Sequence, residues 1–169
     1  DKIFFKNFNL RKPNYFLNAK GSFANQISVI ISKLYDIILK EKPNRFLVLG
    51  DTNSSLGAIV AKRLGIPVFH MEAGNRQFDD VVPEEINRRV IDTSSDILLP
   101  YTSRSAQNLT NEGIDRSRVF VTGNPIYEVI NKFYKDINKS KIHKLLNVQE
   151  KKYFLITLHR QENVDDVNR

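Results

Sequence analysis

The sequence predicts an α/β fold with a mainly parallel sheet flanked by helices, a Rossmann-like arrangement. Short apolar runs of strand length alternate along the chain with stretches whose apolar residues recur at helical spacing. Most of these runs are followed by a polar turn and then a helix, an order that favours parallel strands joined by helical crossovers. The expected strands are 46–49, 68–70, 97–99, 119–121 and 153–158.

Each expected helix has limits that the sequence marks. Segment 21–41 carries apolar residues at helical spacing and ends at Lys42-Pro43. Pro83 suits the first turn of another helix, where Glu84 and Glu85 interact favourably with the helix dipole. The expected helices are 21–41, 56–64, 83–92, 102–112 and a last one that follows Gly123-Asn124-Pro125 and runs to about Phe133.

The chain is expected to hold parts of two domains. Residues 1–123 contain most of the strand–helix alternation and predict a first domain whose start is missing. The stretch 124–152 is rich in lysine and interrupts the alternation, as a connection between domains does. Residues 153–169 hold one more apolar run and a polar segment, so they predict the first strand of a truncated second domain.

Composition excludes several classes of site and partner. The chain has 169 residues, no cysteine and a formal net charge of +7. Without cysteine it forms neither a disulfide framework nor a cysteine-rich zinc site, and a cytoplasmic setting is the natural one. No apolar run is long enough to span a membrane, so no membrane partner is expected. The lysines are scattered at helical spacing, which favours a solvated surface over a nucleic-acid interface.

Polar residues follow the expected strands at the points where ligands bind to open α/β sheets. Asp51, Glu72, Asn124 and His159 each come after a different strand, and Glu84 opens the helix that follows Glu72. Carboxylates and an imidazole gathered at one edge could act as general base and general acid. Glycine-rich phosphate motifs and metal-ligand spacings are absent from the sequence.

Each of these residues also has a structural interpretation. Asp51 could cap the helix that follows it, and Glu84 could do no more than stabilise the first turn of its own helix. His159 could form a surface ion-pair cluster with its neighbours Arg160 and Glu162. Glu72 directly follows an apolar strand, where a carboxylate is hard to explain structurally, so a functional role is favoured for it.

Six motifs occur along the chain in one order. They are Gly50-Asp51-Thr52, His70-Met71-Glu72-Ala73-Gly74-Asn75-Arg76, Pro83-Glu84-Glu85-Ile86-Asn87-Arg88, Ser95-Asp96, Thr122-Gly123-Asn124-Pro125 and Leu158-His159-Arg160-Gln161-Glu162-Asn163. Together they resemble the non-hydrolysing UDP-N-acetylglucosamine 2-epimerase family, and the match runs from about Leu47 to Asn163. Each motif alone is modest, but the six in this order and spacing are highly specific.

The resemblance implies a two-domain fold of the glycosyltransferase-B type, of which this chain is a fragment, with the active site in the cleft between two Rossmann-like domains. It implies a UDP-sugar substrate, from which UDP leaves C1 as the C2 proton is removed. The resulting 2-acetamidoglucal and UDP then recombine, and C2 is protonated on its opposite face. The resemblance also implies a cytoplasmic enzyme of polysaccharide biosynthesis, a homodimer when full length, that needs no cofactor and no metal.

The resemblance also assigns roles to individual positions. Asp51, Glu72 and Glu84 look like the family's catalytic carboxylates, and His159 looks like a histidine that contacts the phosphate-linked region of the substrate. Further substrate contacts are implied at Arg76, Asn124, Arg160 and Glu162. Which carboxylate is the base and which the acid stays open at this point.

Two departures from the family pattern bear on the substrate and on turnover. Asn75 and Gln77 resemble a subgroup that acts on modified hexosamines, so a related UDP-hexosamine is an alternative substrate. The family's N-terminal Gly-Thr-Arg-Pro-Glu loop and its uridine-binding half are not in the chain, so we expect the chain alone to be inactive.

Three other functions stay open at this stage. The first is a hydrolysing epimerase, in which water captures the intermediate and free N-acetylmannosamine is released. The second is a glycosyltransferase of the same fold, which requires an acceptor. The third is a non-catalytic module that binds nucleotides or nucleic acid, and the carboxylates expected in the cleft argue against it.

Overall fold

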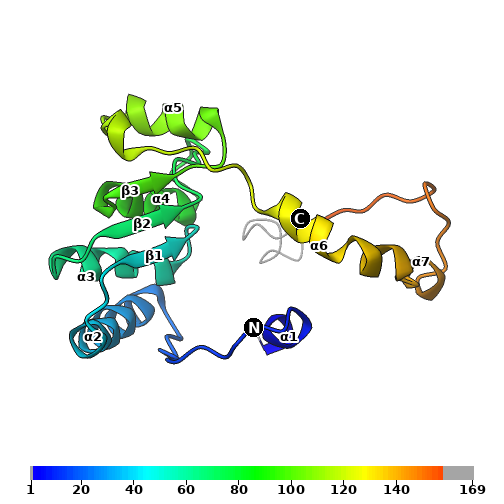
Figure 1. Ribbon diagram of the computed structural model, residues 1–169, viewed down its shortest axis with the longest axis horizontal. Coiled ribbons are helices and arrows are strands. Elements are labelled where there is room, and N and C mark those ends of the chain that lie inside the picture. The colour runs from blue at the N-terminus through cyan, green and yellow to red at the C-terminus, as the bar shows by residue number, and fades with distance from the viewer. Residues whose placement is uncertain (1, 158–169) are drawn as a thin grey trace. The chain divides into compact units, whose positions relative to one another are not determined.

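The chain divides into two compact units, Asp1–Asn124 and Pro125–Arg169. The computed structural model describes residues 2–157 (Figure 1). His159, Arg160 and Glu162, which the sequence analysis placed in the site, therefore lie outside the described residues. The assignment of 124–152 to a connection between domains, and of 153–169 to a second domain, stays a prediction.

The described elements follow one another as the alternation predicts. In chain order they are α1 (Lys2–Asn7), α2 (Phe23–Glu41), β1 (Phe46–Leu49), the 3-10 helix η1 (Asn53–Gly57), α3 (Ala58–Arg63), β2 (Val68–Met71), α4 (Pro83–Ser94), β3 (Ile97–Leu99), α5 (Ser103–Asn111), the 3-10 helix η2 (Arg116–Arg118), α6 (Ile126–Lys139) and α7 (Ile142–Leu145).

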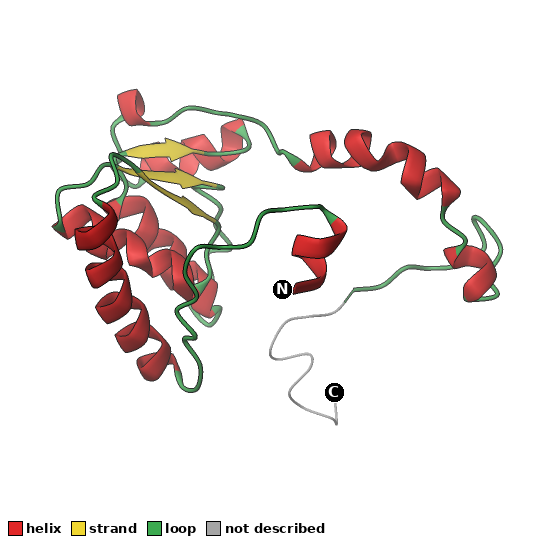
Figure 2. Ribbon diagram, turned by 60° about the horizontal axis from the view of Figure 1, so that its bottom comes forward, coloured by secondary structure: helices red, strands yellow, loops and turns green. Residues whose placement is uncertain are grey.

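The first unit is built on a parallel sheet, whose strands are yellow in Figure 2, and Figure 1 labels them in the order β1-β2-β3. The register brings Val48, His70 and Leu98 side by side across the three strands. Because side chains alternate between the two faces of a strand, these three residues share one face, and all three are buried. The expected parallel sheet flanked by helices is confirmed.

The core lies between this face of the sheet and the helices packed on it. The buried apolar residues of its larger cluster come from α2, β1, η1, α3, β2 and α4: Ile38, Val48, Leu56, Ala58, Val60, Ala61, Val68 and Ile91. On the opposite face, Leu47 and Leu49 of β1 are 60% and 58% exposed. Parallel sheets are normally covered on both faces. Among the described residues, however, no element covers this second apolar face at β1.

Helix α2 ends where the sequence analysis expected, at Glu41, and begins two residues later than expected, at Phe23. The Ser22 side chain caps it by accepting a hydrogen bond from the N–H of Asn25 (3.3 Å). At the other end Lys42 adopts a left-handed conformation, and its N–H donates to the Ile38 carbonyl (2.9 Å). Pro43, which cannot continue the helix, follows.

The expected strand 119–121 is present only as a bridge between Leu98 and Val119. The N–H groups of Phe120 and Thr122 donate to the carbonyls of Leu98 (2.9 Å) and Pro100 (3.0 Å), as in a parallel ladder. Pro100 has no N–H with which to return a bond to this segment, so the ladder is one-sided. This explains why residues 119–121 run beside β3 without forming a full strand.

Three further expectations differ from the structure. The helix expected at 56–64 begins earlier, as the 3-10 helix η1, and continues as α3. The last expected helix does not stop near Phe133 but runs on to Lys139. No strand forms over 153–157, the described part of the strand expected at 153–158.

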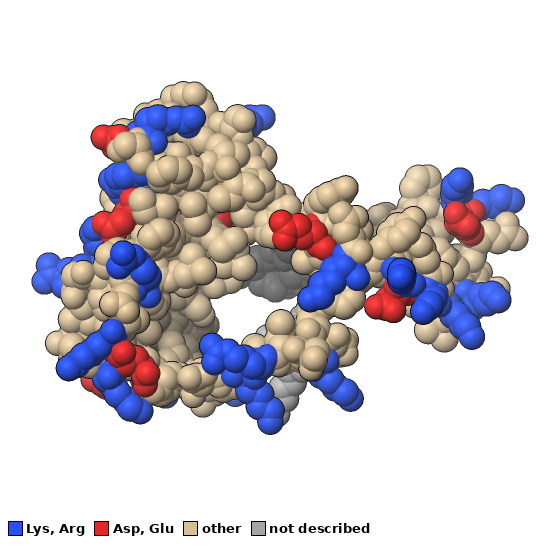
Figure 3. All heavy atoms as spheres, viewed as in Figure 1, with Lys and Arg blue, Asp and Glu red and all other residues tan. Residues whose placement is uncertain are grey.

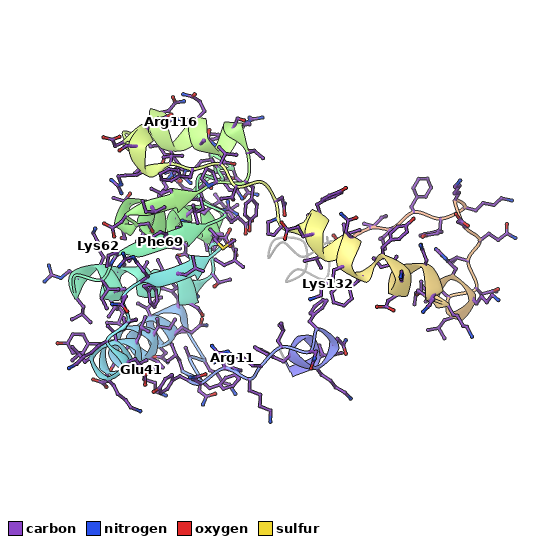
Figure 4. All side chains as sticks on the ribbon, in the orientation of Figure 1. Arg11, Glu41, Lys62, Phe69, Arg116 and Lys132 are labelled. Carbon is purple, nitrogen blue, oxygen red and sulfur yellow. The ribbon has the colours of Figure 1, made fainter. Side chains whose placement is uncertain are left out.

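An ion pair fixes the strand starts opposite the candidate site. Lys62 of α3, labelled in Figure 4, pairs with Asp96, which precedes β3. The other carboxylate oxygen of Asp96 accepts a hydrogen bond from the N–H of Val68, the first residue of β2 (2.9 Å). The side chain of Asp96 thus links α3 to the starts of two neighbouring strands.

Candidate active site

The carboxyl ends of β1 and β2 bring two predicted site residues together. Leu49 pairs with Met71, and Gly50 continues the ladder by donating its N–H to the Met71 carbonyl (3.1 Å). Asp51 and Glu72 follow directly. A Cβ built on Gly50 would lie 3.4 Å from a carboxylate oxygen of Glu72, so this carboxylate lies against the backbone that leads into Asp51.

Asp51 is held by helix α4 and does not cap η1. Its carboxylate accepts hydrogen bonds from Nε (2.8 Å) and pairs with Nη2 (2.6 Å) of Arg88. Asn87 donates from its side chain to the Asp51 carbonyl (2.9 Å). Thr52, the residue that precedes η1, makes no side-chain capping bond. The Asn87-Arg88 pair therefore fixes both the backbone and the carboxylate of Asp51.

Glu72 has an unusual backbone and an unusual charge environment. Its φ of 68° is left-handed, a conformation that costs a non-glycine residue energy and that clusters at functional sites. Burial raises the pKa of Glu72, and the negative charge of Asp51 raises it further. The positive charges of Arg88 and His70 oppose this shift without cancelling it. Glu72 therefore holds a proton more readily than an exposed glutamate does.

Tyr101 is a site candidate that the sequence analysis missed. It follows β3 at the same edge of the sheet where Asp51 follows β1. Burial raises the pKa of its hydroxyl, and the nearby charge of Glu72 raises it further. The rule that polar residues after parallel strands form the site would have identified it, because only Pro100 separates it from the strand.

Glu84 and Glu85 differ although they are adjacent. Glu84 is exposed in the first turn of α4, and no hydrogen bond or ion pair within residues 2–157 joins it to Asp51 or Glu72. Glu85 is fully buried and accepts bonds from the N–H groups of Gln77 (3.0 Å) and Phe78 (3.3 Å). It also pairs with Arg88 (3.0 Å). Glu85 thus anchors the loop between β2 and α4.

Arg76 and Asn124, the two predicted substrate contacts within the described residues, have different surroundings. The guanidinium of Arg76 is buried between Asp92 of α4 (2.8 Å) and Glu112 after α5 (2.6 Å). These two ion pairs give Arg76 a structural use in this fold. Asn124 is exposed and follows Gly123 at the end of the first unit.

The described residues offer no other obvious centre of chemistry. Within 2–157, no group of three or more His, Cys, Asp and Glu residues could hold a metal ion. No helix in that range is both long and apolar enough to cross a membrane. On the face shown in Figure 3, basic and acidic side chains are interspersed over the helices around the sheet, which does not favour a nucleic-acid interface there.

Comparisons of the sequence with known proteins agree on one family. A family model described as UDP-N-acetylglucosamine 2-epimerase matches residues 1–169. The chain is 42% identical over 171 residues to a UDP-N-acetylglucosamine 2-epimerase of Methanococcus maripaludis, and the match covers 98% of this chain and 47% of that protein. It is 40% identical over 168 residues to the UDP-2,3-diacetamido-2,3-dideoxy-D-glucuronate 2-epimerase of Pseudomonas aeruginosa, with the same two coverages of 98% and 47%.

Solved structures share the fold at high similarity. The UDP-N-acetylglucosamine 2-epimerase of Rickettsia bellii superposes with a TM-score of 0.90 at 45% identity, covering 96% of this chain and 44% of that one. The enzyme of Methanocaldococcus jannaschii, in complex with UDP-GlcNAc and UDP, gives 0.89 at 43% identity, covering 98% and 47%. The chain thus spans about half the length of the curated relatives it matches.

Proposed function

The chain belongs to the UDP-N-acetylglucosamine 2-epimerase family, and from that membership we propose that the complete protein interconverts UDP-N-acetylglucosamine and UDP-N-acetylmannosamine. The observation that carries this proposal is the pair Asp51 and Glu72 at neighbouring strand ends, where the two carboxylates have unequal surroundings. The Methanocaldococcus jannaschii relative, solved in complex with UDP-GlcNAc and UDP, supports a UDP-sugar as the substrate.

The reaction proceeds by elimination and re-addition of UDP. In the first half the C1–O bond breaks, UDP departs with the bonding electron pair, and a base takes the C2 proton as the C1–C2 double bond forms. In the second half UDP adds back to C1, and an acid returns a proton to the opposite face of C2. Because no ketone acidifies the C2–H bond, C1–O cleavage must be well advanced, and C1 then carries positive charge.

The two carboxylates suit different parts of this reaction. Burial and Asp51 raise the pKa of Glu72 towards the operating pH, which is the property a proton-transfer group needs. Asp51 is oriented by two contacts from Arg88, and its negative charge suits the stabilisation of positive charge at C1. The other assignments stay predictions: Glu84 and His159 as catalytic residues, and Arg76, Asn124, Arg160 and Glu162 as substrate contacts.

Solvent exchange at C2 tests the proposed function. The enzyme at the full length of its relatives, incubated with UDP-N-acetylglucosamine in deuterated water, should incorporate deuterium at C2 and form the epimer. Glu72→Gln should lower the exchange rate by about 100-fold or more, because the proton-transfer group is lost. Glu41→Gln, at the exposed end of α2, is the matched control and should exchange as the unmodified enzyme does.

Two outcomes separate the parts of the proposal. An unmodified enzyme that incorporates no deuterium at C2 is not an epimerase of this type. Normal exchange by the Glu72→Gln variant, in an enzyme that is otherwise active, removes Glu72 from the proton-transfer step. Release of free N-acetylmannosamine in place of a UDP-sugar would identify the hydrolysing reaction.

The identity of the sugar needs its own comparison. The relatives named for UDP-N-acetylglucosamine and for UDP-2,3-diacetamido-2,3-dideoxy-D-glucuronate are 42% and 40% identical to this chain, so overall identity does not separate the two substrates. Asn75, which donates from its side-chain amide to Glu72 (3.2 Å), is with Gln77 one of the two residues that resemble the subgroup acting on modified hexosamines. Measuring kcat/KM for both UDP-sugars decides between them.

The wider setting belongs to the same proposal. A cytoplasmic homodimer that supplies polysaccharide biosynthesis is what membership of this family leads us to expect. Size-exclusion chromatography with light scattering on the full-length enzyme measures the oligomeric state, and a monomer there would refute the homodimer.

A further inference from the structure

His70 is a buried histidine near the carboxyl end of β2, the strand that Glu72 follows, and its ring contacts the backbone that leads into Asp51. It lies in the middle strand β2, with Val48 and Leu98 beside it in the register, and is 1% exposed. Its Nδ1 lies 2.7 Å from a carboxylate oxygen of Asp92 on α4, and its Nε2 lies 3.1 Å from the carbonyl oxygen of Gly50. Both ring nitrogens therefore face hydrogen-bond acceptors.

Two acceptors require two donors. A neutral imidazole carries one N–H and one lone pair, so it can donate to Asp92 or to Gly50 but not to both. The second nitrogen would then direct its lone pair at an oxygen, which leaves a buried polar contact unsatisfied. Opposite a carboxylate at Asp92, the imidazolium, with a proton on each nitrogen, is the form of the ring that satisfies both contacts.

The surrounding charges support a positive ring. The second carboxylate oxygen of Asp92 pairs with Arg76 (2.8 Å) and accepts the N–H of Gly74 (3.2 Å). Arg76 has Glu112 as a further partner (2.6 Å). With His70 protonated, two cations and two carboxylates balance in this network, which is the condition under which charges are tolerated in a protein interior.

The network reaches both candidate catalytic carboxylates. The Gly50 carbonyl that His70 binds belongs to the peptide that leads into Asp51, so the ring fixes the orientation of that peptide. Glu72 follows His70 by two residues, in the strained left-handed conformation, and feels the charge of the ring directly. Asp92 contacts His70, which precedes Glu72 in the chain, and Gly74 and Arg76, which follow it. The backbone is therefore anchored on both sides of Glu72.

We propose that His70, held as an imidazolium between Asp92 and the Gly50 carbonyl, is a positioning residue that sets the geometry of Asp51 and Glu72 and supplies fixed positive charge beside Glu72. This inference rests on the proposed function, since it concerns the same carboxylates. His70 has no direct contact with the substrate in this role. It acts through the two residues that it positions.

A pH profile distinguishes this role from a merely structural one. In the full-length enzyme, the limb of the kcat/KM profile that belongs to Glu72 is identified as the limb that Glu72→Gln abolishes. His70→Gln removes a positive charge whose effect is to lower the pKa of Glu72, so that pKa rises. The limb then moves to higher pH, whether Glu72 acts as base or as acid. The value of kcat falls by about 10- to 100-fold with a smaller change in KM, because the carboxylates are misplaced.

His143 provides the matched control. It is a half-buried histidine in α7, and its Nε2 contacts the hydroxyl of Tyr153 (2.8 Å). His143→Gln should leave the limb and kcat unchanged. The same variant identifies the His143 signals in nitrogen NMR of the full-length enzyme, where His70, assigned through its backbone correlations, should show protons on both ring nitrogens at neutral pH.

Each result decides one point. A limb that does not move in a folded, active His70→Gln enzyme overturns the positioning role. If that variant fails to fold, the NMR decides, and a single tautomer of neutral His70 in the unmodified enzyme overturns the inference. An unmodified enzyme without C2 exchange defeats the proposed function instead, and does so before any variant is compared.

Discussion

Glu84 and Glu85 are consecutive in the sequence, yet their surroundings differ completely. Glu85 is buried, and burial alone would raise its pKa. The N–H of Gln77, the guanidinium of Arg88 and the N–H of Phe78 outweigh burial and hold the pKa of Glu85 below its ordinary value. Glu84 is exposed and has no such partner among the described residues. Substituting each glutamate in turn therefore compares a buried, hydrogen-bonded carboxylate with an exposed one at adjacent positions.

The first prediction concerns stability and pH. Because the folded pKa of Glu85 is lowered, its ionised form stabilises the fold above the ordinary glutamate pKa of 4.5, and this contribution is lost as the pH falls through the folded value. Glu85→Gln should reduce the free energy of unfolding at neutral pH by about 2 kcal/mol. The difference from the unmodified chain should shrink in acid. Urea unfolding at several pH values measures this.

Glu84→Gln is the control for that measurement. It should change the free energy of unfolding at neutral pH far less than Glu85→Gln does, because no hydrogen bond or ion pair within residues 2–157 holds the exposed Glu84 carboxylate, and only its interaction with the helix dipole is lost. Equal losses in the two variants would show that burial and the loop contacts of Glu85 do not stabilise the fold.

At the residue scale, the sequence predicted the placement of Asp51 and Glu72 because parallel strands end at one edge of a sheet. It did not predict the roles of Glu85 and His70. Their partners, Gln77 for one and Asp92 for the other, become neighbours only after α4 packs on the sheet. A local pattern contains no signal for such contacts.

At the element scale, the strands and helices of the first unit followed from apolar periodicity, while the segment 119–121 did not form a full strand. Its composition is typical of a strand, but the partner residue Pro100 cannot donate a backbone hydrogen bond. The proline that limits the ladder directly follows the neighbouring strand β3, so the composition of 119–121 alone contains no signal for it. Strand prediction here required knowledge of the pairing.

The close approach of the loop after β2 to helix α5 leads to a second stability prediction. Gly74 has a φ of 76°, and a Cβ placed there would lie 2.2 Å from the Ser105 carbonyl oxygen and 2.8 Å from Cγ of Leu109. Gly74→Ala should therefore destabilise the fold by about 3 kcal/mol, from backbone strain and overpacking together. Thermal unfolding monitored by circular dichroism measures the loss.

Gly65→Ala separates strain from overpacking. Gly65 has nearly the same φ, 75°, but nothing lies within 4 Å of a Cβ placed there. Only the left-handed backbone then opposes the substitution, and we expect a loss of about 1 kcal/mol. Similar losses at the two glycines would mean that the loop after β2 can move away from α5.

At the scale of the whole molecule, the described residues leave apolar surface open. One face of the sheet exposes Leu47 and Leu49, and α6 of the second unit exposes Tyr127, Tyr134 and Ile137. Parallel sheets and amphipathic helices are normally covered on their apolar sides. The relatives are about twice as long as this chain, of which the matches cover 47% of their length. A protein of that length has further chain with which to cover these faces.

The last prediction follows from that difference in length. The chain of 169 residues, incubated alone with UDP-N-acetylglucosamine in deuterated water, should form no epimer and incorporate no deuterium at C2. Expulsion of UDP needs binding energy from parts of the substrate that do not react, and contacts with the uridine and phosphates supply it. Even with Asp51 and Glu72 correctly placed, the chain alone would not gain the binding energy of those uridine and phosphate contacts. Circular dichroism must first show that the chain is folded, and the full-length enzyme must be active under the same conditions. Exchange by the chain at a rate comparable to the full-length enzyme would mean that Asp51 and Glu72, with the residues around them, suffice for the reaction.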